Sequence, residues 1–493
     1  MLFYTMSHIS RLDSFYNLLE IATNFIKNIV ENDKQVLIIS HYDADGLSSA
    51  AILLDLLLSE KILFHLKIAE QVDNNLLTFL KENEYQYIIL LDMGSRSLNF
   101  LCNIGKEVLI LDHHEPLISD KMREKVNVLN PHIVGINGSF EISTSGIVYF
   151  LAKNFLRKNY EKYIIPAIVG ALGDRQDIGP QFRLVGLNEK IIEEGVRKGI
   201  IETKIGLRLY GLNRNPLVKA LAYTMDPYIP GLSGNENACF MFFKRIGINP
   251  IKNGKLRYFS SLTNQEVKKL ATELIKYAIS KGVSVKNAEK LFGVNYYILS
   301  EDKNTMFHDA RDYSIVLNAC GRMERYDLAI LIFNEKWKKK IINDILNVVK
   351  EYRKHLAQFL EKIYSESSKF TRESKYFTII MSHEINSKMC GAIASMLTTF
   401  FTKKPFIMVM TSLNNGNIKI SIRKTQRKFE RNIINLGKII GKISEKIGGY
   451  GGGHSNAGGA IIPKNSIENF IKKIDEEIEK TMRNIGDLNK ENS

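Results

Sequence analysis

The first part of the chain alternates short apolar runs with helical patterns. The runs "QVLIIS" (35–40), "YIILL" (87–91) and "EVLIL" (107–111) are rich in β-branched residues and leucine, and an amphipathic segment from about Leu47 to Ser59 follows the first of them. This alternation is typical of a parallel sheet covered by helices. The sequence therefore predicts an α/β fold over residues 1–205.

The remaining chain divides into two further regions, since 493 residues are too many for one hydrophobic core. Residues 206–375 carry longer helical patterns, and the segment from Lys336 to about Lys369 has no Gly or Pro, so we expect one long connecting helix there. Its lysines fit a solvated face better than a nucleic-acid contact. Strand character returns in "YFTIIMS", "PFIMVMT" and "NIKISIR", which predicts a small α/β domain over 376–485.

Acidic and imidazole groups follow the three apolar runs of the first domain, where strands end. The set comprises His41, Asp43 and Asp45 after the first run, Asp92 after the second, and Asp112, His113 and His114 after the third. Asp174, in "VGALGDRQD", follows an apolar helix. The carboxyl ends of parallel strands meet at one edge, and carboxylates gathered there repel one another unless cations neutralise them. The pattern predicts a metal centre.

The donor types narrow the choice of metal. Carboxylate and imidazole without thiolate suit Mn²⁺, or Mg²⁺ where oxygen dominates. The four cysteines form no CxxC pair, which argues against a zinc site and a disulfide framework and favours a reducing cytoplasm. So many carboxylates indicate two ions bridged by one of them, an arrangement that activates water and holds a phosphoryl group. We therefore expect metal-assisted phosphoester hydrolysis.

The charge of the chain favours a polyanionic partner. The net charge is +15 with a pI near 9.3, and lysines and arginines that neutralise phosphates release counterions. A lysine-rich solvated surface is the alternative. The sequence has no apolar run of about 18 residues and no secretory signal pattern, so we expect no membrane span and a cytoplasmic location.

The motifs "DADG", the Asp in "LDMGS", "DHH" and "GALGD" occur in the order that is seen in the DHH phosphoesterases. The glycine-rich "GGGHSNAGGA" resembles the signature of their C-terminal DHHA1 substrate-binding domain. Within this superfamily, "ALGDRQD", "KALAYTMDPYIPGLSGNENA" and "LNACGRMERYDLAI" resemble the RecJ branch, and in particular archaeal RecJ-like nucleases associated with the GINS complex. The resemblance implies a DHH catalytic domain, a helix-rich middle region and a DHHA1 domain around a cleft.

The resemblance also implies residue roles. The implied metal ligands are Asp43, Asp45, Asp92 as the bridge, His113 and Asp174, with His41 near the first ion. Asp112 and His114 are implied to orient ligands or substrate beside this catalytic set. The implied phosphate contacts are Arg423, Gly452, Gly453 and His454. Arg322 and Arg325 in "GRMERYD" are separate candidates that could line the channel between domains and bind substrate, with a purely structural role as the alternative.

Structural alternatives accompany several of these residues. Arg423 could form a surface salt bridge, and Ser143 or Ser145 in "STSG" could be a helix N-cap instead of facing the site. Several aromatic residues are candidate stacking platforms for bases, with the hydrophobic core as the alternative. They are Tyr210, Tyr223, Phe240, Phe242 and Phe243.

The expected function is a metal-dependent exonuclease for single-stranded DNA, or RNA, in replication or repair, with 5′ to 3′ polarity implied by the RecJ resemblance. One alternative is a replisome scaffold that binds GINS and has secondary nuclease activity. Another is a phosphodiesterase of oligonucleotides or cyclic dinucleotides. Polarity and the choice between DNA and RNA stay open at this point.

Overall fold

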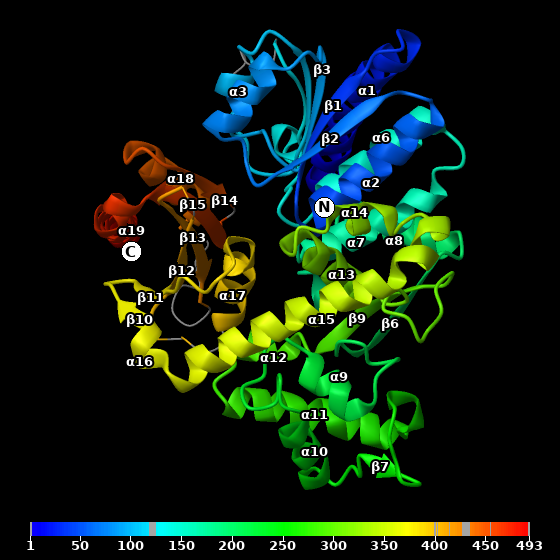
Figure 1. Ribbon diagram of the computed structural model, residues 1–493, viewed down its shortest axis with the longest axis vertical. Coiled ribbons are helices and arrows are strands. Elements are labelled where there is room, and N and C mark those ends of the chain that lie inside the picture. The colour runs from blue at the N-terminus through cyan, green and yellow to red at the C-terminus, as the bar shows by residue number, and fades with distance from the viewer. Residues whose placement is uncertain are drawn as a thin grey trace. The chain divides into compact units, whose positions relative to one another are not determined.

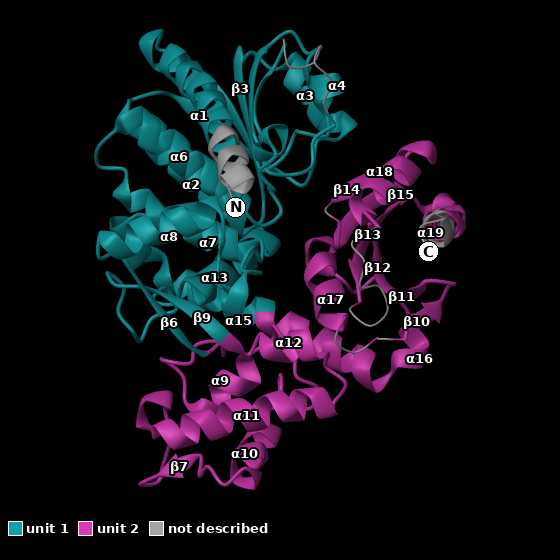
Figure 2. Cartoon of the chain, turned by 180° about the vertical axis from the view of Figure 1, so that it is seen from behind, with its two compact units in different colours: residues 1–206, 293–352 teal, residues 207–292, 353–493 magenta. Residues whose placement is uncertain are grey.

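The computed structural model describes residues 2–117, 125–398, 401, 403–413, 415–425, 434–453 and 455–491, with side chains between Arg11 and Arg483. The chain forms two compact units (Figure 1; Figure 2). Unit 1 comprises Met1–Gly206 and Gly293–Tyr352, and unit 2 comprises Leu207–Phe292 and Arg353–Ser493. The predicted helix-rich region 206–375 is thus shared between the units, and the division into three consecutive domains stays a prediction.

Unit 1 contains the predicted parallel sheet, with strand order β2-β1-β3-β4-β5 and parallel pairing throughout. The strands are β1 (Val36–His41), β2 (Phe64–Ala69), β3 (Tyr87–Leu91), β4 (Glu107–Leu111) and β5 (Asn127–Leu129). The three predicted apolar runs are β1, β3 and β4, so the α/β fold with a parallel sheet is confirmed. A separate two-stranded sheet pairs β6 (Ile201–Leu207) with β9 (Phe292–Ile298).

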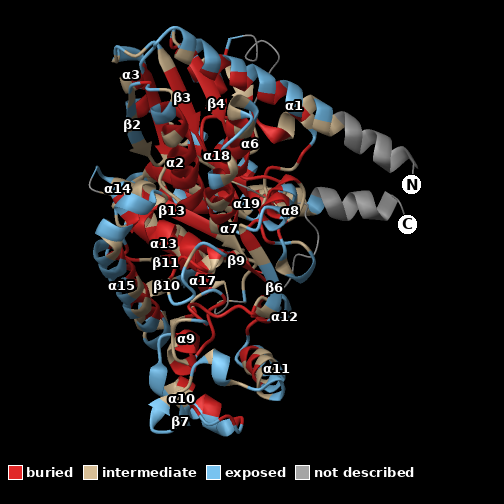
Figure 3. Ribbon diagram, turned by 90° about the vertical axis from the view of Figure 1, so that its right-hand side faces the viewer, coloured by how far each residue is buried: buried red, intermediate tan, exposed pale blue. Residues whose placement is uncertain are grey.

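Helices bury both faces of the sheet, which is why the central strands are apolar at nearly every position. Alternate residues such as Leu37, Ile88 and Val108 pack with Leu76 and Leu98 of α3 and α4. Figure 3 shows the strands β3 and β4 as largely buried and the outer helices as mixed. The helices of unit 1 are α1 (Leu2–Glu31), α2 (Ala44–Ser59), α3 (Asn74–Glu82), α4 (Leu98–Leu101), α6 (Thr144–Leu156), α7 (Ile164–Gly173), α8 (Leu187–Arg197), α13 (Ala310–Arg322) and α14 (Tyr326–Leu331).

The predicted connecting helix is α15 (Glu335–Ser365), followed by the short α16 (Ser367–Phe370). Several of its apolar residues recur at helical spacing and are buried, among them Ile345, Tyr352 and Leu356, whereas Trp337 and Leu346 are exposed. Six 3₁₀ turns are described: η1 (Pro131–Val134), η2 (Glu161–Tyr163), η3 (Pro180–Phe182), η4 (Phe259–Ser261), η5 (Ser387–Met389) and η6 (Lys464–Ser466). Among the helices that the structure describes, none is both long and apolar enough to cross a membrane.

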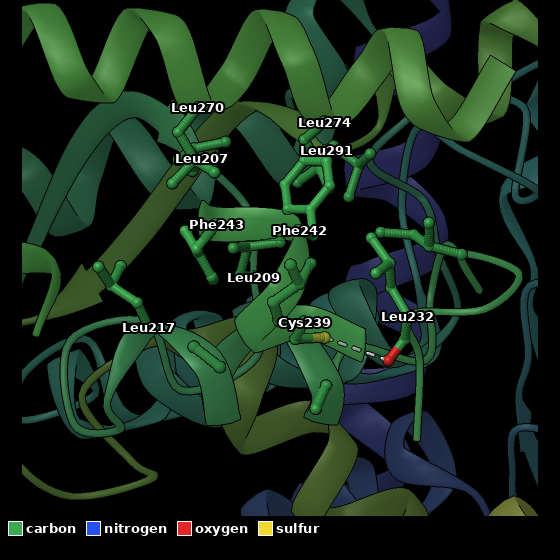
Figure 4. Close-up of a cluster of buried hydrophobic side chains, with 14 of the residues drawn as sticks. Leu207, Leu209, Leu217, Leu232, Cys239, Phe242, Phe243, Leu270, Leu274 and Leu291 are labelled. Carbon is green, nitrogen blue, oxygen red and sulfur yellow. Dashed lines mark hydrogen bonds between the residues drawn. The ribbon is translucent and has the colours of Figure 1, made fainter. Parts of the chain in front are cut away.

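The first part of unit 2 is a small helical body around an apolar core (Figure 4). It contains α9 (Leu217–Tyr223), α10 (Glu236–Arg245), α11 (Asn264–Ser280), α12 (Val285–Glu289) and the hairpin of β7 (Ile251–Lys252) and β8 (Lys255–Leu256). Phe242 and Phe243 lie inside this core, and Tyr223 and Phe240 pack against it. Tyr210 is also buried. The core alternative therefore describes Phe242 and Phe243 better than base stacking does.

The second part of unit 2 is the predicted C-terminal α/β body, whose sheet has the order β10-β11-β12-β13-β15-β14. Only β11 and β12 pair in parallel among its described strands. The elements are β10 (Thr371–Glu373), β11 (Phe377–Met381), α17 (Cys390–Leu397), β12 (Phe406–Ser412), β13 (Asn417–Lys424), α18 (Leu436–Lys446), β14 (Tyr450–Gly453), β15 (Ala457–Pro463) and α19 (Ile467–Glu491). The glycine-rich segment is thus largely the β14 and β15 pair.

Candidate metal centre

The turn between β1 and α2 carries the first acidic residues. Asp43 is the N-cap of α2, and its side chain accepts a hydrogen bond from Gly46 N at 3.1 Å, while Asp45 lies buried in the first helical turn. A Cβ atom on Gly46 would come within 2.4 Å of the carbonyl oxygen of His41. The glycine of "DADG" is therefore required for the tight approach of strand and helix.

Asp92 directly follows β3 and has a left-handed backbone, with φ of 61°. Such a conformation is uncommon outside glycine, although Asp and Asn adopt it more readily than other residues, and it marks functional sites. The backbone N–H of Asp92 donates to Leu111 O at 2.9 Å, which ties the turn to the end of β4. The residue is 2% exposed, so its carboxylate is held inside the protein.

Side chains from all three strand ends converge around Asp92, as the sequence predicted. His113 Nε2 lies 3.3 Å from Asp92 Oδ1 and 3.0 Å from Asp174 Oδ2, and His41 Nδ1 lies 3.3 Å from Asp92 Oδ2. Within each of three groups, the potential ligand atoms lie within 4.8 Å of one another. The groups are Asp45, Asp92, His113 and Asp174; His41, Asp43 and Asp92; and Asp92, His113 and His114. Asp92 belongs to every group.

The protonation of His113 suits a metal ligand. Its Nδ1 lies 2.7 Å from the carbonyl oxygen of Gly138, so Nδ1 carries the proton and donates it, and Nε2 points toward the carboxylates. Gln176 Nε2 also donates to Gly138 O, at 2.8 Å. His41 Nδ1 lies close to Asp92 Oδ2 and to Asp43 Oδ2, at 3.3 and 3.0 Å, but among the described residues the buried atoms His41 Nδ1 and Asp92 Oδ2 form no hydrogen bond of good geometry. These donor atoms fit a divalent cation.

The buried charges also favour a cation. Burial and the carboxylates of Asp92 and Asp174 raise the pKa of Asp45 to about 8. Burial would lower the pKa of His113, but Asp174 and Asp92 raise it well above its ordinary value. The raised pKa of Asp45 means that its carboxyl group resists ionisation, and the raised pKa of His113 means that this imidazole tends to keep a proton. Both effects arise because too little positive charge surrounds the buried carboxylates. A bound cation would supply it.

Asp112 holds His114 in place. Its Oδ1 accepts from His114 Nδ1 at 2.7 Å and from His114 N at 3.0 Å, and its Oδ2 accepts from Ser95 N at 3.0 Å. Burial would raise the pKa of Asp112, but His114 outweighs it and lowers the pKa to about 2. Asp112 is therefore a carboxylate that orients an imidazole, as carboxylates beside metal-binding histidines commonly do.

The start of α6 supports two of the carboxylates. The backbone N–H groups of Thr144 and Ser145 donate to the two oxygens of Asp45, at 2.7 and 3.0 Å. The Thr144 hydroxyl donates to Asp92 Oδ1 at 3.1 Å. Ser143 is the N-cap of α6, as the alternative interpretation of "STSG" held. No role of Thr144 was predicted from the sequence.

Helix α13 of unit 1 also borders the site. Asn318 Oδ1 accepts from Ala44 N at 3.3 Å. Arg322 ends the helix, and its Nη1 donates to the Tyr352 hydroxyl at 2.6 Å. Burial would lower the pKa of Arg322, but Tyr352, Tyr42 and Asp43 raise it. The negative charge of Asp43 therefore interacts with the Arg322 guanidinium. The segment "LNACGRMERYDLAI" carried a family resemblance, but its contact with the metal centre was not predicted.

Unit 2 contains the predicted phosphate-binding residues. Arg423 lies on β13, and its guanidinium donates from Nε to Ser395 Oγ at 3.0 Å and from Nη1 to Ser421 Oγ at 3.1 Å. Gly452 and Gly453 lie on β14 and pair with β15. His454 lies outside the residues that the structure describes.

The chain matches known families and sequences. Three family profiles match the chain: "DHH family, N-terminal domain" over residues 35–172, "DHH-CID domain" over 209–292 and "DHHA1 domain" over 373–480. The chain is 32% identical over 478 residues to the uncharacterized protein MJ0831 of Methanocaldococcus jannaschii, covering 94% of this chain and 98% of that protein. It is 26% identical over 174 residues to the single-stranded-DNA-specific exonuclease RecJ of Bacillus subtilis, covering 33% of this chain and 22% of RecJ.

Solved structures share the fold. CDC45 from Entamoeba histolytica aligns with a TM-score of 0.62 at 11% identity, over 92% of this chain and 97% of CDC45. RecJ from Thermus thermophilus in complex with Mn²⁺ aligns with a TM-score of 0.54 at 16% identity, over 94% of this chain and 55% of RecJ. Both likenesses concern the fold. The profiles and the relative that matches along nearly its whole length lead to one conclusion: the chain is a RecJ-like member of the DHH/DHHA1 family.

Proposed function

We propose that the chain is a metal-dependent exonuclease that hydrolyses phosphodiester bonds of single-stranded nucleic acid. The observation that carries the proposal is the convergence of carboxylates and imidazoles on Asp92, in groups that each suit a divalent cation. Two ions sharing Asp92 would supply a Lewis acid for the phosphoryl group and a source of hydroxide at neutral pH. We propose that the site binds two ions.

The residues divide between the two proposed ions. Asp45, His113 and Asp174 would hold one ion together with Asp92, and His41 and Asp43 would hold the other. The shared Asp92 is favoured by its two oxygens, because Oδ1 lies toward His113 and Oδ2 toward His41. His114, oriented by Asp112, is placed to contact substrate beside these ligands.

The choice of a nucleic-acid substrate rests on charge and on unit 2. A net charge of +15 favours a long polyanion over a small phosphoester. In unit 2, Arg423 is oriented by two serine hydroxyls, and a fixed guanidinium can donate to two phosphate oxygens at once. Arg423, Gly452, Gly453 and His454 are therefore proposed to bind the phosphate backbone, with Arg322 as a further phosphate contact. We propose 5′ to 3′ polarity, as in the RecJ resemblance, and a role in DNA replication or repair.

A second candidate function is a scaffold that binds GINS and has secondary nuclease activity. The likeness in fold to CDC45, which extends over 92% of this chain, favours considering it, although that likeness concerns the fold alone. The intact set of metal donors favours the enzyme. Binding of purified GINS that persists in an Asp92→Asn variant, with no measurable digestion by the wild type, would favour the scaffold.

The decisive experiment incubates single strands of DNA and RNA, labelled at the 5′ or the 3′ end, with the protein and Mn²⁺ or Mg²⁺. The variant Asp43→Asn keeps a helix-capping side chain but removes the charge. The control Asp55→Asn alters a carboxylate of α2 that pairs with Lys162. We expect metal-dependent shortening by wild type and control but not by Asp43→Asn.

Two results would contradict the proposal. Absence of metal-dependent shortening of either strand refutes the exonuclease, and equal activity of Asp43→Asn refutes the assigned site. Turnover of dinucleotides or cyclic dinucleotides without digestion of long strands would identify the small-substrate phosphodiesterase instead. The order in which labelled products appear from the two ends gives the polarity.

A further inference from the structure

We propose that Thr144 is a positioning residue that fixes two of the candidate metal-binding carboxylates relative to each other. The inference rests on the proposed metal centre but concerns a residue outside the ligand set. Thr144 is the first residue of α6, directly after the N-cap Ser143.

Thr144 bonds to carboxylates from two different strand ends. Its backbone N–H donates to Asp45 Oδ2 at 2.7 Å, and its hydroxyl donates to Asp92 Oδ1 at 3.1 Å. Asp45 belongs to the turn after β1, whereas Asp92 follows β3. Ser145 N donates to the other oxygen of Asp45, at 3.0 Å. One rigid helix start therefore holds both acids.

The hydroxyl of Thr144 has a specific effect on Asp92. The two oxygens of the Asp92 carboxylate face different histidines. Oδ1 lies 3.3 Å from His113 Nε2, and Oδ2 lies 3.3 Å from His41 Nδ1. A hydrogen bond to Oδ1 fixes the plane of this carboxylate, so that each oxygen faces one of the two donor groups. Thr144, Asp45 and Asp92 are all buried, so bulk water does not reach the hydroxyl's position to replace it.

Hydrogen bonds to charged acceptors are stronger than those between neutral groups. Removal of a residue that orients a metal ligand typically lowers metal affinity or activity about 10- to 100-fold. Loss of the Thr144 hydroxyl should therefore weaken metal binding although no ligand is lost. The backbone bond to Asp45 survives any substitution other than proline, which isolates the effect on Asp92.

The test measures Mn²⁺ binding to the full chain by calorimetry and by electron paramagnetic resonance. Thr144→Val keeps the shape but removes the hydroxyl, and Thr144→Ser keeps the hydroxyl. We expect about 10-fold or greater loss of Mn²⁺ affinity in the valine variant and near wild-type affinity in the serine variant. Thr411→Val is the matched control, because it removes a buried hydroxyl that donates to Ile385 O in unit 2.

Equal Mn²⁺ affinity of Thr144→Val and wild type would overturn the proposal. So would an equal loss in Thr23→Val, which removes a buried hydroxyl of unit 1 that donates to Leu19 O. Circular dichroism and gel filtration establish folding. Thr144→Ala replaces the valine variant if that one does not fold, and failure of both to fold would make Thr144 a folding residue and refute the positioning role.

Because the test measures Mn²⁺ affinity and not digestion, the role of Thr144 can be decided separately from the proposed exonuclease activity. Wild-type protein that binds Mn²⁺ but digests no strand refutes the exonuclease, and the variants still decide the role of Thr144. Wild-type protein that binds no Mn²⁺ refutes both.

Discussion

Gly321 of α13 lies directly against the backbone carbonyl of Tyr42, and a Cβ atom on Gly321 would come within 1.8 Å of that oxygen. Tyr42 stands between His41 and Asp43 in the turn that carries part of the metal centre. Three residues earlier in the helix, Asn318 bonds to Ala44 across 274 positions of sequence. A helix from late in the chain therefore supports the first metal-binding turn.

Replacing Gly321 with alanine should displace this turn, because the new Cβ atom would clash with the backbone oxygen of Tyr42, which cannot move without the turn. We expect unit 1 to lose about 1 to 3 kcal/mol of unfolding free energy, the range typical of overpacking, together with a loss of Mn²⁺ affinity. Trp337, the only tryptophan of the chain, lies in unit 1 and reports its unfolding by fluorescence in denaturant.

The control for this variant is Gly206→Ala. The nearest heavy atom to a Cβ on Gly206 is Asn295 Nδ2, at 3.6 Å, which is an ordinary contact. Its unfolding midpoint should stay close to that of wild type. A Gly321→Ala protein with unchanged stability and Mn²⁺ affinity would show that α13 does not constrain the turn.

Asp92→Asn should abolish stabilisation of unit 1 by metal. Asn tolerates the left-handed backbone at this position, so the variant tests the charge and not the conformation. A ligand at 100 times its dissociation constant stabilises a protein by about 2.7 kcal/mol, so wild type should show a clear rise of melting temperature when Mn²⁺ is added after EDTA treatment. Asp55→Asn should keep this rise. A rise of equal size in Asp92→Asn would remove Asp92 from the centre of the proposed site.

The parts of the fold that could be predicted are those with strong local patterns. The strands β1, β3 and β4 are buried on both faces and read as continuous apolar runs. The strand β2 was missed because it is an edge strand with exposed polar residues, His65 and Lys67, between its apolar positions. The strand β5 was missed because it has only three residues.

The candidate site follows the same division. Acidic and imidazole residues directly after a strand can be predicted to converge, because topology places strand ends at one edge. Thr144 and Gly321 could not be predicted from local pattern, since their importance depends on contacts with Asp92 and Tyr42, far away in sequence. Periodicity reports which face of an element is buried and carries no information about which distant residue it meets.

The pair of Arg257 and Glu266 in unit 2 predicts a pH-dependent contribution to stability. Nη1 and Nη2 of Arg257 donate to the two Glu266 oxygens at 2.8 and 3.0 Å. The hydrogen bond from Arg257 is the main cause that lowers the Glu266 pKa from 4.5 to about 2. A lowered carboxyl pKa stabilises the folded state above the ordinary pKa, and the effect is lost as pH falls from about 4.5 toward 2.

We expect Glu266→Gln to destabilise α11 by about 1 kcal/mol at pH 7, a value reduced because the pair is partly solvated, and by about half as much at pH 3. Hydrogen–deuterium exchange of α11, compared between variant and wild type at each pH, measures the difference. Glu273→Gln on the same helix removes a more exposed partner of Lys276 and should change protection little. A difference that is equal at both pH values would contradict the assignment to the Glu266 charge.

Arg423→Lys should weaken strand binding without affecting the metal centre. Lysine keeps the charge but lacks the planar fork with which the guanidinium donates to Ser395 and Ser421 and keeps further N–H groups for a phosphate. We expect the KM for a single strand to rise about tenfold, a loss of about 1.4 kcal/mol, with kcat and Mn²⁺ affinity near wild type, since the lost contact binds ground state and transition state alike. Arg372→Lys is the control, because that arginine pairs with Glu468 at the surface. A fall in kcat at unchanged KM would instead place Arg423 among the groups that act on the reacting phosphate. Weaker Mn²⁺ binding by Arg423→Lys would contradict the proposal that unit 1 binds the metal and unit 2 binds the strand.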